Sequence, residues 1–315
     1  MFGSIKKIFR SFDWSLPVVL LVVGALCGCQ VFNDSCPVGT PEVWGKGLPT
    51  DLDIRKEYIR QCEAPVGNFI ADAILNYDYN VDLGDSHIHV ALINAGAIRD
   101  GVACGSTTSS RDRIPKGPIT DQDILQLLPF SDTVVIVKMK GSQLKRVLEH
   151  SVSSLNLSGE LGQEGHFLQV AGKDGISIEI DCSKPAQTLN ETGMGIVTPG
   201  ERIVSMRYGK NDIEIIPTGD YYVATLDYLV GDDDGVPNDG FVGFHYKADD
   251  EPEPPVVIQT YIPLIDVVHY WLGNYETTIT DEYPDDPDVL KTYPSSEGRL
   301  VYTSCDELAG ICATQ

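Results

Sequence analysis

A six-residue segment and its neighbours carry side chains that suit the binding of an oxyanion. Residues 94–99 (NAGAIR) directly follow an apolar run, and Gly96 permits a tight turn or a close approach of the backbone to a ligand. Asn94 offers both a hydrogen-bond donor and an acceptor, and Arg99 offers a planar fork that matches an oxyanion. A plain turn at a strand end with a surface arginine is the alternative interpretation of the same six residues.

Two aromatic residues stand at the ends of predicted elements. Phe130 follows Pro129, and Tyr228 follows Asp227. Two aromatic faces can sandwich a planar base, and each stacking contact of this kind contributes roughly 1–3 kcal/mol. Packing of both rings in the core is the alternative interpretation.

Metal-dependent and nucleophilic chemistry find little support. The acidic turn 231–235 lacks the alternating ligands of a calcium loop, and His87 and His89 have no partner motif. A two-metal phosphoesterase needs a cluster of Asp, His and Asn ligands, but no Gly-Asn-His-Asp/Glu or Gly-His-x-His motif occurs. Neither a Gly-x-Ser-x-Gly elbow nor a phosphate loop ending in Gly-Lys-Ser/Thr is present. We therefore assign no catalytic residue and no metal site.

Hydrophobic periodicity predicts the elements that position these residues. Helices are expected over residues 65–77, 142–152 and 260–272, and a shorter one between a capping box at Thr120 and Pro129. Strands are expected over residues 87–93, 133–140, 167–170, 176–182, 202–207, 213–216, 221–227 and 298–302. Strands and helices mix without strict alternation, which predicts a layered α/β domain with a mixed sheet.

The charge balance of the chain limits the classes of partner that it can bind. The formal net charge is −23, from 46 acidic and 23 basic residues. Such a surface repels nucleic-acid backbone and acidic lipid, so we expect no nucleic-acid partner and no polybasic membrane contact. A small anion can still bind where arginines are locally concentrated. The 315 residues are 42% hydrophobic, which is enough to bury a core in one large domain or two small ones.

The first 29 residues have the features of an export leader. Lys6, Lys7 and Arg10 precede an apolar run at residues 16–26, and the tetrapeptide LCGC that ends at Cys29 resembles a bacterial lipobox. We expect a lipoprotein anchor on Cys29, with ordinary signal cleavage and secretion, or a retained anchor helix, as alternatives. Each places the body of the protein outside the cytoplasm, with membrane contact only through the N-terminus.

The domain boundaries follow from this leader. Residues 30–50 are expected to be a tether, residues 51–304 a single domain, and residues 305–315 a C-terminal tail. The chain has eight cysteines, of which six follow the leader, and an even number in an exported chain predicts disulfides. Cys305 and Cys312 are the first expected pair because they are close in sequence. Cys62 with Cys104 is a second candidate pair.

Several segments, taken in order, resemble the C-terminal domain of the 5′-nucleotidase family, which includes UDP-sugar hydrolases and ecto-5′-nucleotidases. They are residues 60–72 (RQCEAPVGNFIAD), 94–99, 119–152, 167–170 (FLQV), 227–235 and 297–300 (EGRL). The family enzymes add an N-terminal metallophosphoesterase domain with two divalent metals and the catalytic His. The resemblance covers the second domain alone, and it implies a four-layered α-β-β-α fold with no cofactor in this chain.

The resemblance also implies roles for individual residues. Phe130 and Tyr228 would hold the base between their rings, and Asn94 would hydrogen-bond the base. Arg60 and Arg99 would face the ribose and the phosphate. Asp234 would accept from the ribose hydroxyls. The family pattern after the second ring is Gly-Gly-Asp-Gly and an aromatic residue. Here Asp232 and Asp233 replace the two glycines, and Val236 replaces the aromatic residue. Two extra carboxylates disfavour a phosphate group, which leaves a nucleoside or a nucleotide-sugar as alternative ligands.

The expected function is therefore a nucleotide- or nucleoside-binding domain of 5′-nucleotidase type. We expect it to serve extracytoplasmic nucleotide catabolism without hydrolysing nucleotides by itself. One alternative is half of a split enzyme that acts with a separate metallophosphoesterase chain. Another is a non-catalytic surface or scaffold protein that keeps the fold.

Overall fold

The structure, a computed structural model, describes ten stretches of the chain, all within the unit Cys36–Gln315. They are residues 43–48, 51–99, 113–114, 117–155, 165–231, 238–245, 254–278, 297–306, 308 and 312. The expected leader, its Cys29 and the expected ribose ligand Asp234 lie outside the described residues. Among those described, no helix combines the length and the apolar character that crossing a membrane requires.

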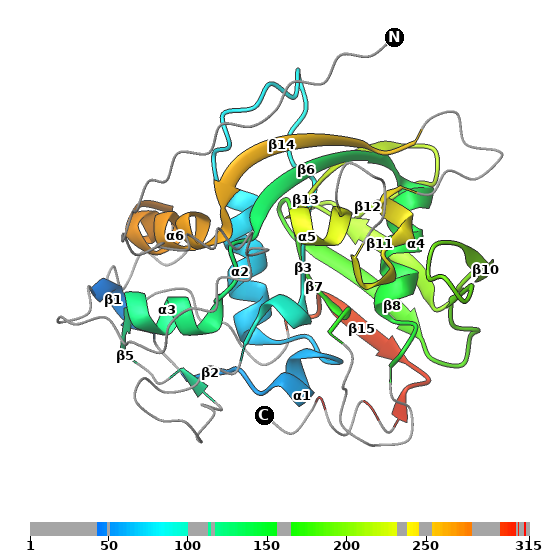
Figure 1. The fold of residues 1–315 in the computed structure, drawn as a ribbon, viewed down its shortest axis with the longest axis horizontal. Coiled ribbons are helices and arrows are strands. Elements are labelled where there is room, and N and C mark those ends of the chain that lie inside the picture. Colours follow the sequence, from blue (N-terminus) through cyan, green and yellow to red (C-terminus); the bar gives the residue numbers. More distant parts are fainter. Residues whose placement is uncertain are drawn as a thin grey trace, which may run out of the picture. The chain divides into compact units, whose positions relative to one another are not determined.

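A five-stranded sheet forms the centre of this unit. Its strand order is β14 (Val256–Pro263), β6 (Thr133–Lys140), β13 (Asp220–Leu226), β3 (Val90–Asn94) and β7 (Leu168–Gly172). Only β13 and β3 run parallel, so the predicted mixed sheet is confirmed. The valines and isoleucines of β3 and β6 are buried, as expected of central strands. Figure 1 shows β14 and β6 as two long neighbouring strands.

A second, four-stranded sheet has the order β12 (Ile213–Glu214), β11 (Ile203–Tyr208), β8 (Ile176–Asp181) and β15 (Leu300–Thr303). Ile178 and Ile180 of β8 alternate inward, which is the period-two pattern of a sheet with one buried face. Three two-stranded pairs complete the strands: β1 (Val43–Leu48) with β5 (Gly117–Thr120), β2 (Leu52–Asp53) with β4 (Arg113–Ile114), and β9 (Thr188–Leu189) with β10 (Ile196–Thr198).

The helices are α1 (Lys56–Ile59), α2 (Pro65–Asn76), α3 (Asp121–Leu127), α4 (Gly141–Ser151), α5 (Asp227–Val230) and α6 (Leu264–Thr278), with 3₁₀ turns at Ala95–Ala97, Asn238–Gly240 and Val242–Phe244. The helices predicted over residues 65–77 and 142–152 are confirmed. Pro65 opens α2, where its missing N–H costs nothing, and α2 packs against β3, β7 and α6. Helix α4 contacts both β6 and β11.

Two predicted boundaries are wrong. Residues 43–48, expected to be part of a tether, form β1, which pairs antiparallel with β5 with Trp44 opposite Ile119. The helix expected over residues 260–272 begins only at Leu264, because the preceding residues continue β14 and Pro263 still lies opposite Thr133 of β6. In both cases a strand partner distant in sequence overrides the local pattern.

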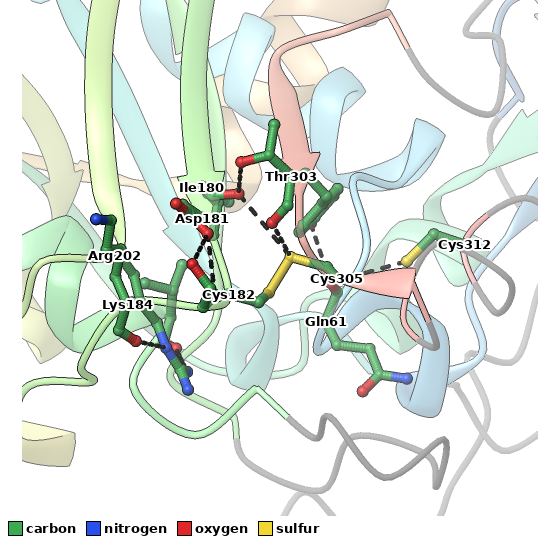
Figure 2. Close-up of a disulfide and its surroundings, with 12 residues drawn as sticks. Gln61, Ile180, Asp181, Cys182, Lys184, Arg202, Thr303, Cys305 and Cys312 are labelled. Atoms are coloured by element: carbon green, nitrogen blue, oxygen red, sulfur yellow. Dashed lines mark hydrogen bonds between the residues drawn. A yellow bond between two sulfur atoms is a disulfide. The ribbon is translucent and has the colours of Figure 1, made fainter.

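Both expected cysteine pairs are also wrong. The structure pairs Cys182 with Cys305 and Cys62 with Cys312, with Cα–Cα distances of 5.2 and 5.4 Å. Strand β15 runs parallel to β8 with Thr303 opposite Asp181, so Cys305 emerges beside Cys182 (Figure 2). Strand register therefore decides the pairing. The buried Leu308 and the bridge at Cys312 attach the expected C-terminal tail to the domain.

Candidate functional site

A pocket of about 310 Å³ lies where β3 ends. It is lined by Arg60, Asn94, Gly96, Ala97, Arg99, Phe130, Asp132, Gly165, Tyr228 and Asp239. The structure thus brings together five of the residues that the resemblance implies for ligand binding; the sixth, Asp234, lies outside the described residues. They come from the end of α1, the turn after β3, the segment between α3 and β6, and helix α5.

The turn after β3 is held by a close approach to the segment before β7. The N–H of Ala95 donates to the carbonyl of Phe167, and the N–H of Gly96 donates to the carbonyl of Gly165, each at 2.7 Å. A Cβ on Gly96 would lie 3.1 Å from the Gly165 oxygen and 3.0 Å from Nδ2 of Asn94. Glycine fits here because the two backbones pass closely, and a Cβ would push its neighbours away by a few tenths of an ångström.

Asn94, which lines the pocket, carries a buried acceptor without a donor within the described residues. The residue is only 2% exposed, and its Oδ1 accepts no hydrogen bond from the part of the chain that the structure describes. A buried polar atom without a partner costs about 1–3 kcal/mol. A hydrogen-bond donor on a bound ligand would recover this cost.

Arg99 stacks on the first aromatic ring of the pocket. Its Cζ lies 4.8 Å from the centroid of Phe130, within the range of a cation–π contact. The capping box at Thr120 that starts α3 is confirmed, and the far end of this helix, Leu127, accepts the backbone N–H of Arg99 at 2.9 Å. Helix α3 therefore positions both the arginine and the ring that follows it.

The second ring, Tyr228, is anchored at both its backbone and its hydroxyl. The carboxylate of Asp227 accepts from the backbone N–H and the hydroxyl of Thr133 at 3.0 and 2.7 Å, and from the N–H of Tyr228 at 2.8 Å. The hydroxyl of Tyr228 donates to Oδ1 of Asp239 at 3.1 Å. Phe130 and Tyr228 are 45% and 40% exposed, so the alternative that they pack in the core is wrong.

Asp239 is a pocket residue that the sequence prediction did not include. It lies in the turn Asn238–Gly240 with φ of +51°, a left-handed conformation that Asp adopts more readily than most residues. The tripeptide Asp239-Gly-Phe241 matches the Asp-Gly-aromatic end of the family pattern, at a later position than Asp234. That tripeptide is the sequence signal that points to Asp239. The expectation for Asp234 stays a prediction, because that residue lies outside the described ranges.

Two buried histidines lie behind Asp239. Nε2 of His150 donates to the carbonyl oxygen of Asp239 at 2.6 Å, and the His150 and His166 rings stack with centroids 4.8 Å apart. Burial lowers the pKa of both residues, and that of His166 falls to about 4. Both rings are therefore neutral at pH 7.

The acidic side of the pocket includes Asp132. Burial, helped by the nearby charge of Asp227, raises the pKa of Asp132 to about 6. Burial also raises the pKa of Tyr228; Asp239 and Asp132 add to this, and Arg99 opposes it. These three charges therefore lie within electrostatic reach of the tyrosine hydroxyl. In the described ranges, no group of three or more His, Cys, Asp or Glu side chains is placed to hold a metal ion.

Comparisons with known proteins agree with this architecture. A family model described as "5′-nucleotidase, C-terminal domain" matches residues 37–239, more than half of the 315 residues. The chain is 30% identical to human 5′-nucleotidase over 157 residues, which is 49% of this chain and 22% of the human protein. It is 31% identical to the trifunctional nucleotide phosphoesterase protein YfkN of Bacillus subtilis over 187 residues, 58% of this chain and 10% of that protein.

A solved structure shares the fold. The 5′-nucleotidase precursor from Thermus thermophilus superposes with a TM-score of 0.58 at 22% identity, covering 83% of this chain and 39% of that one. The chain belongs to the 5′-nucleotidase C-terminal domain family. The expected mixed α/β fold of this family is confirmed. The chain spans about a fifth of the length of the human relative and about a tenth of the bacterial one.

Proposed function

We propose that this domain binds a nucleoside or nucleotide in the pocket at the end of β3, with the base between Phe130 and Tyr228. The observation that carries the proposal is that two half-exposed rings and the buried, unsatisfied Oδ1 of Asn94 line one pocket. Apolar ring faces left in contact with water favour a flat apolar ligand, and an unsatisfied buried acceptor favours a ligand with a donor. Membership of the 5′-nucleotidase family supports a nucleotide-related ligand.

The remaining lining residues suit the sugar and the phosphate. Arg60 and Arg99 supply guanidinium groups, which pair well with phosphate oxygens. The carboxylate of Asp239 already accepts from Tyr228 and has a second oxygen for a ribose hydroxyl. Asp239 is therefore a candidate for the ribose contact, and Asp234, outside the described residues, stays the residue that the resemblance implies.

We further propose that the domain binds its ligand without hydrolysing it. The support is that the sequence contains none of the two-metal phosphoesterase motifs. A metallophosphoesterase on a separate chain would supply hydrolysis in the split-enzyme alternative. Metal-dependent turnover of AMP by the pure protein, abolished by Arg99→Ala, would contradict this proposal, and co-purification of a phosphoesterase would support the split enzyme.

We propose that the domain works outside the cytoplasm. The disulfides Cys62–Cys312 and Cys182–Cys305 support this location because such bonds persist in oxidising compartments. Attachment through a lipid on Cys29 is the proposed form of membrane contact. Incorporation of labelled palmitate in vivo, lost in Cys29→Ser, tests the anchor separately from the fold.

A thermal-shift screen of the full chain tests the proposed binding. The ligands are adenosine, guanosine, AMP and UDP-glucose, and specific binding raises the melting temperature by mass action. Phe130→Ala and Tyr228→Ala remove one ring each, and Tyr261→Ala is the matched control because Tyr261 is an exposed aromatic residue that does not line the pocket. A shift lost in both pocket variants and kept in the control supports the proposal. Absence of a shift with every ligand favours the scaffold alternative.

A further inference from the structure

We propose that Asp132 is a specificity-determining residue, which selects a guanine base by accepting its two adjacent N–H donors. The inference rests on the proposed function, in that the pocket must first bind a nucleoside. It adds the class of base that the pocket selects. Two carboxylates of the pocket lie near the hydroxyl of Tyr228, those of Asp132 and Asp239. Oδ1 of Asp239 already accepts from that hydroxyl, so Asp132 is the charged acceptor left for a base.

Asp132 has a fixed position in the wall of the pocket. Its carbonyl oxygen accepts from the N–H of Leu264 at 3.0 Å, which ties it to the first residue of α6. The next residue, Thr133, begins β6 and is bound by Asp227 through both its backbone and its hydroxyl. Asp132 follows the ring of Phe130 closely in the chain, and both line the pocket. The backbone at Asp132 is therefore fixed by two neighbouring elements close to the ring.

The carboxylate of Asp132 has no partner of its own. Among the described residues it makes no side-chain hydrogen bond and no ion pair, although it is partly buried beside Asp227. A partly buried carboxylate without a donor is unfavourable in the empty pocket, since its lost hydration is not replaced. Hydrogen bonds from the N–H groups of a ligand would replace the hydration that the carboxylate loses on burial.

Two residues that line one pocket therefore carry acceptors without a donor among the described residues. They are the carboxylate of Asp132 and Oδ1 of Asn94, which is buried and lacks a donor from the described residues. Polar groups built to hydrogen-bond a ligand discriminate strongly against analogues that lack the matching group, because the protein atoms are then left unpaired. The occupant is thus expected to present donors rather than acceptors at its base edge.

Guanine fits this requirement better than the other common bases. Its N1–H and 2-amino group are adjacent donors, and a carboxylate accepts two parallel N–H groups with its two oxygens. Adenine and cytosine place a ring-nitrogen lone pair beside their amino group, which would face a carboxylate oxygen. Uracil offers a single N–H between two carbonyl oxygens. Repulsion between lone pairs therefore disfavours all three bases at Asp132.

Isothermal titration calorimetry of the full chain at pH 7.5 tests this inference, with guanosine, inosine and adenosine as the probes. Inosine keeps N1–H and lacks the 2-amino group, so we expect it to bind about tenfold more weakly than guanosine, and adenosine at least as weakly, because charge-assisted hydrogen bonds are lost. Asp132→Asn keeps the shape of the side chain and should reduce the guanosine preference to about threefold or less. Asp85→Asn removes one charge from an exposed position and should preserve the preference.

The possible outcomes separate this inference from the proposed function. If the wild-type chain binds none of the three nucleosides, the proposed function fails. If nucleosides bind through Phe130 and Tyr228 but guanosine has no advantage, or if Asp132→Asn retains it, the inference is wrong and the pocket assignment stands. The comparison of guanosine with inosine uses only the wild-type chain, so a variant that fails to fold does not affect it.

Discussion

Nε2 of His150 donates a hydrogen bond to the carbonyl oxygen of Asp239 at 2.6 Å, and this bond links the buried helix α4 to the pocket. The side chain of Asp239 in turn accepts from the hydroxyl of Tyr228. The neighbours of His150 also anchor the helix: Glu149 accepts the N–H groups at the start of β11, and Ser151 accepts the N–H of Leu168 in β7. The last turn of α4 thus sets the position of one pocket wall.

Replacement of His150 should therefore weaken ligand binding although the residue does not line the pocket. His150→Phe keeps a ring against His166 and removes the donor to Asp239, and we expect about a threefold to tenfold loss of affinity from a misplaced carboxylate. His150→Gln retains an N–H donor and should restore part of the loss. Calorimetric titration measures both; an unchanged Kd in His150→Phe, with only a lower Tm, would assign His150 to packing alone.

Two substitutions of Tyr228 separate the contribution of its ring to the binding free energy from that of its hydroxyl. Tyr228→Phe keeps the ring and loses the bond to Asp239, so we expect a loss of about 0.5–1.5 kcal/mol in binding free energy. Tyr228→Ala also removes the ring face and should cost roughly a further 1–3 kcal/mol. The measurement is the nucleoside Kd of both variants; equal losses in the two would show that the ring does not stack on the ligand.

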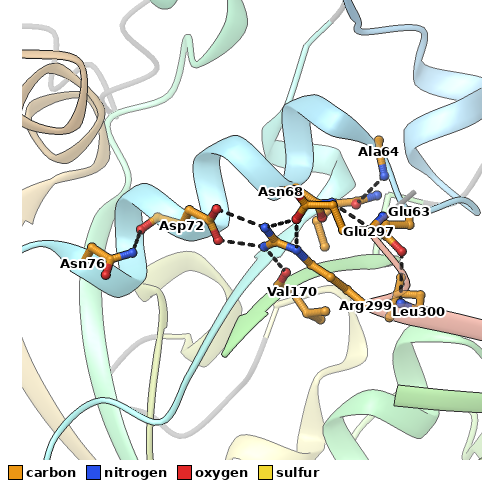
Figure 3. A network of polar contacts seen from close by, with 10 residues as sticks. Glu63, Ala64, Asn68, Asp72, Asn76, Val170, Glu297, Arg299 and Leu300 are labelled. Carbon is orange, nitrogen blue, oxygen red and sulfur yellow. Dashed lines mark hydrogen bonds and ion pairs between the residues drawn. The ribbon is translucent and has the colours of Figure 1, made fainter. Parts of the chain in front are cut away.

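Arg299 should be a major determinant of stability. It donates to both carboxylate oxygens of Asp72 at 2.7 and 3.0 Å, pairs with Glu297 and reaches the carbonyl of Val170, which joins the start of β15 to α2 and β7 (Figure 3). Arg299→Met removes the cation from a buried carboxylate, and we expect a destabilisation of about 3–5 kcal/mol. Urea denaturation measures it, with Arg207→Met as control, because the Arg207–Asp212 pair is exposed. A loss below about 1 kcal/mol would contradict this role.

Buried histidines should make the domain sensitive to acid. Burial lowers the pKa of His89 and of His166 from the ordinary value of 6.5 to about 4, so the unfolded chain binds these protons at a higher pH than the folded one. Their stabilising contribution is complete above pH 6.5 and is lost as the pH falls towards 4, by up to about 1.4 kcal/mol per pH unit for each histidine. Asp132, whose pKa is raised to about 6, and Glu149, whose pKa burial also raises, act in the opposite direction.

Urea denaturation at pH 7.5, 6 and 5 measures this sensitivity. We expect the free energy of unfolding to decrease with each step, and His166→Phe to reduce the slope, since it removes one of these buried protonation sites. A free energy of unfolding that rises between pH 7.5 and 5 would show that the carboxylates dominate instead.

Much of the fold was predictable because its signals are local. The capping box at Thr120, the β-branched run at the start of Thr133–Lys140 and the apolar faces of α2 and α4 depend on residues within a few positions of each other. The motif at residues 94–99 and the two aromatic residues likewise pointed to Asn94, Arg99, Phe130 and Tyr228, all of which line the pocket. Chemistry carried by residue type and short spacing can be read directly from the chain.

Contacts between distant segments were not predictable in this way. The pairing of Cys182 with Cys305 follows from the register of β15 on β8, and β1 exists because β5 lies beside it. Asp239 and Asp132 reach the pocket because the turn after α5 and the start of β6 converge there. Residue types and local spacing thus determined the elements and most of the candidate site. Register and long-range packing determined the disulfides and the acidic side of the pocket, because these depend on which distant backbones lie side by side.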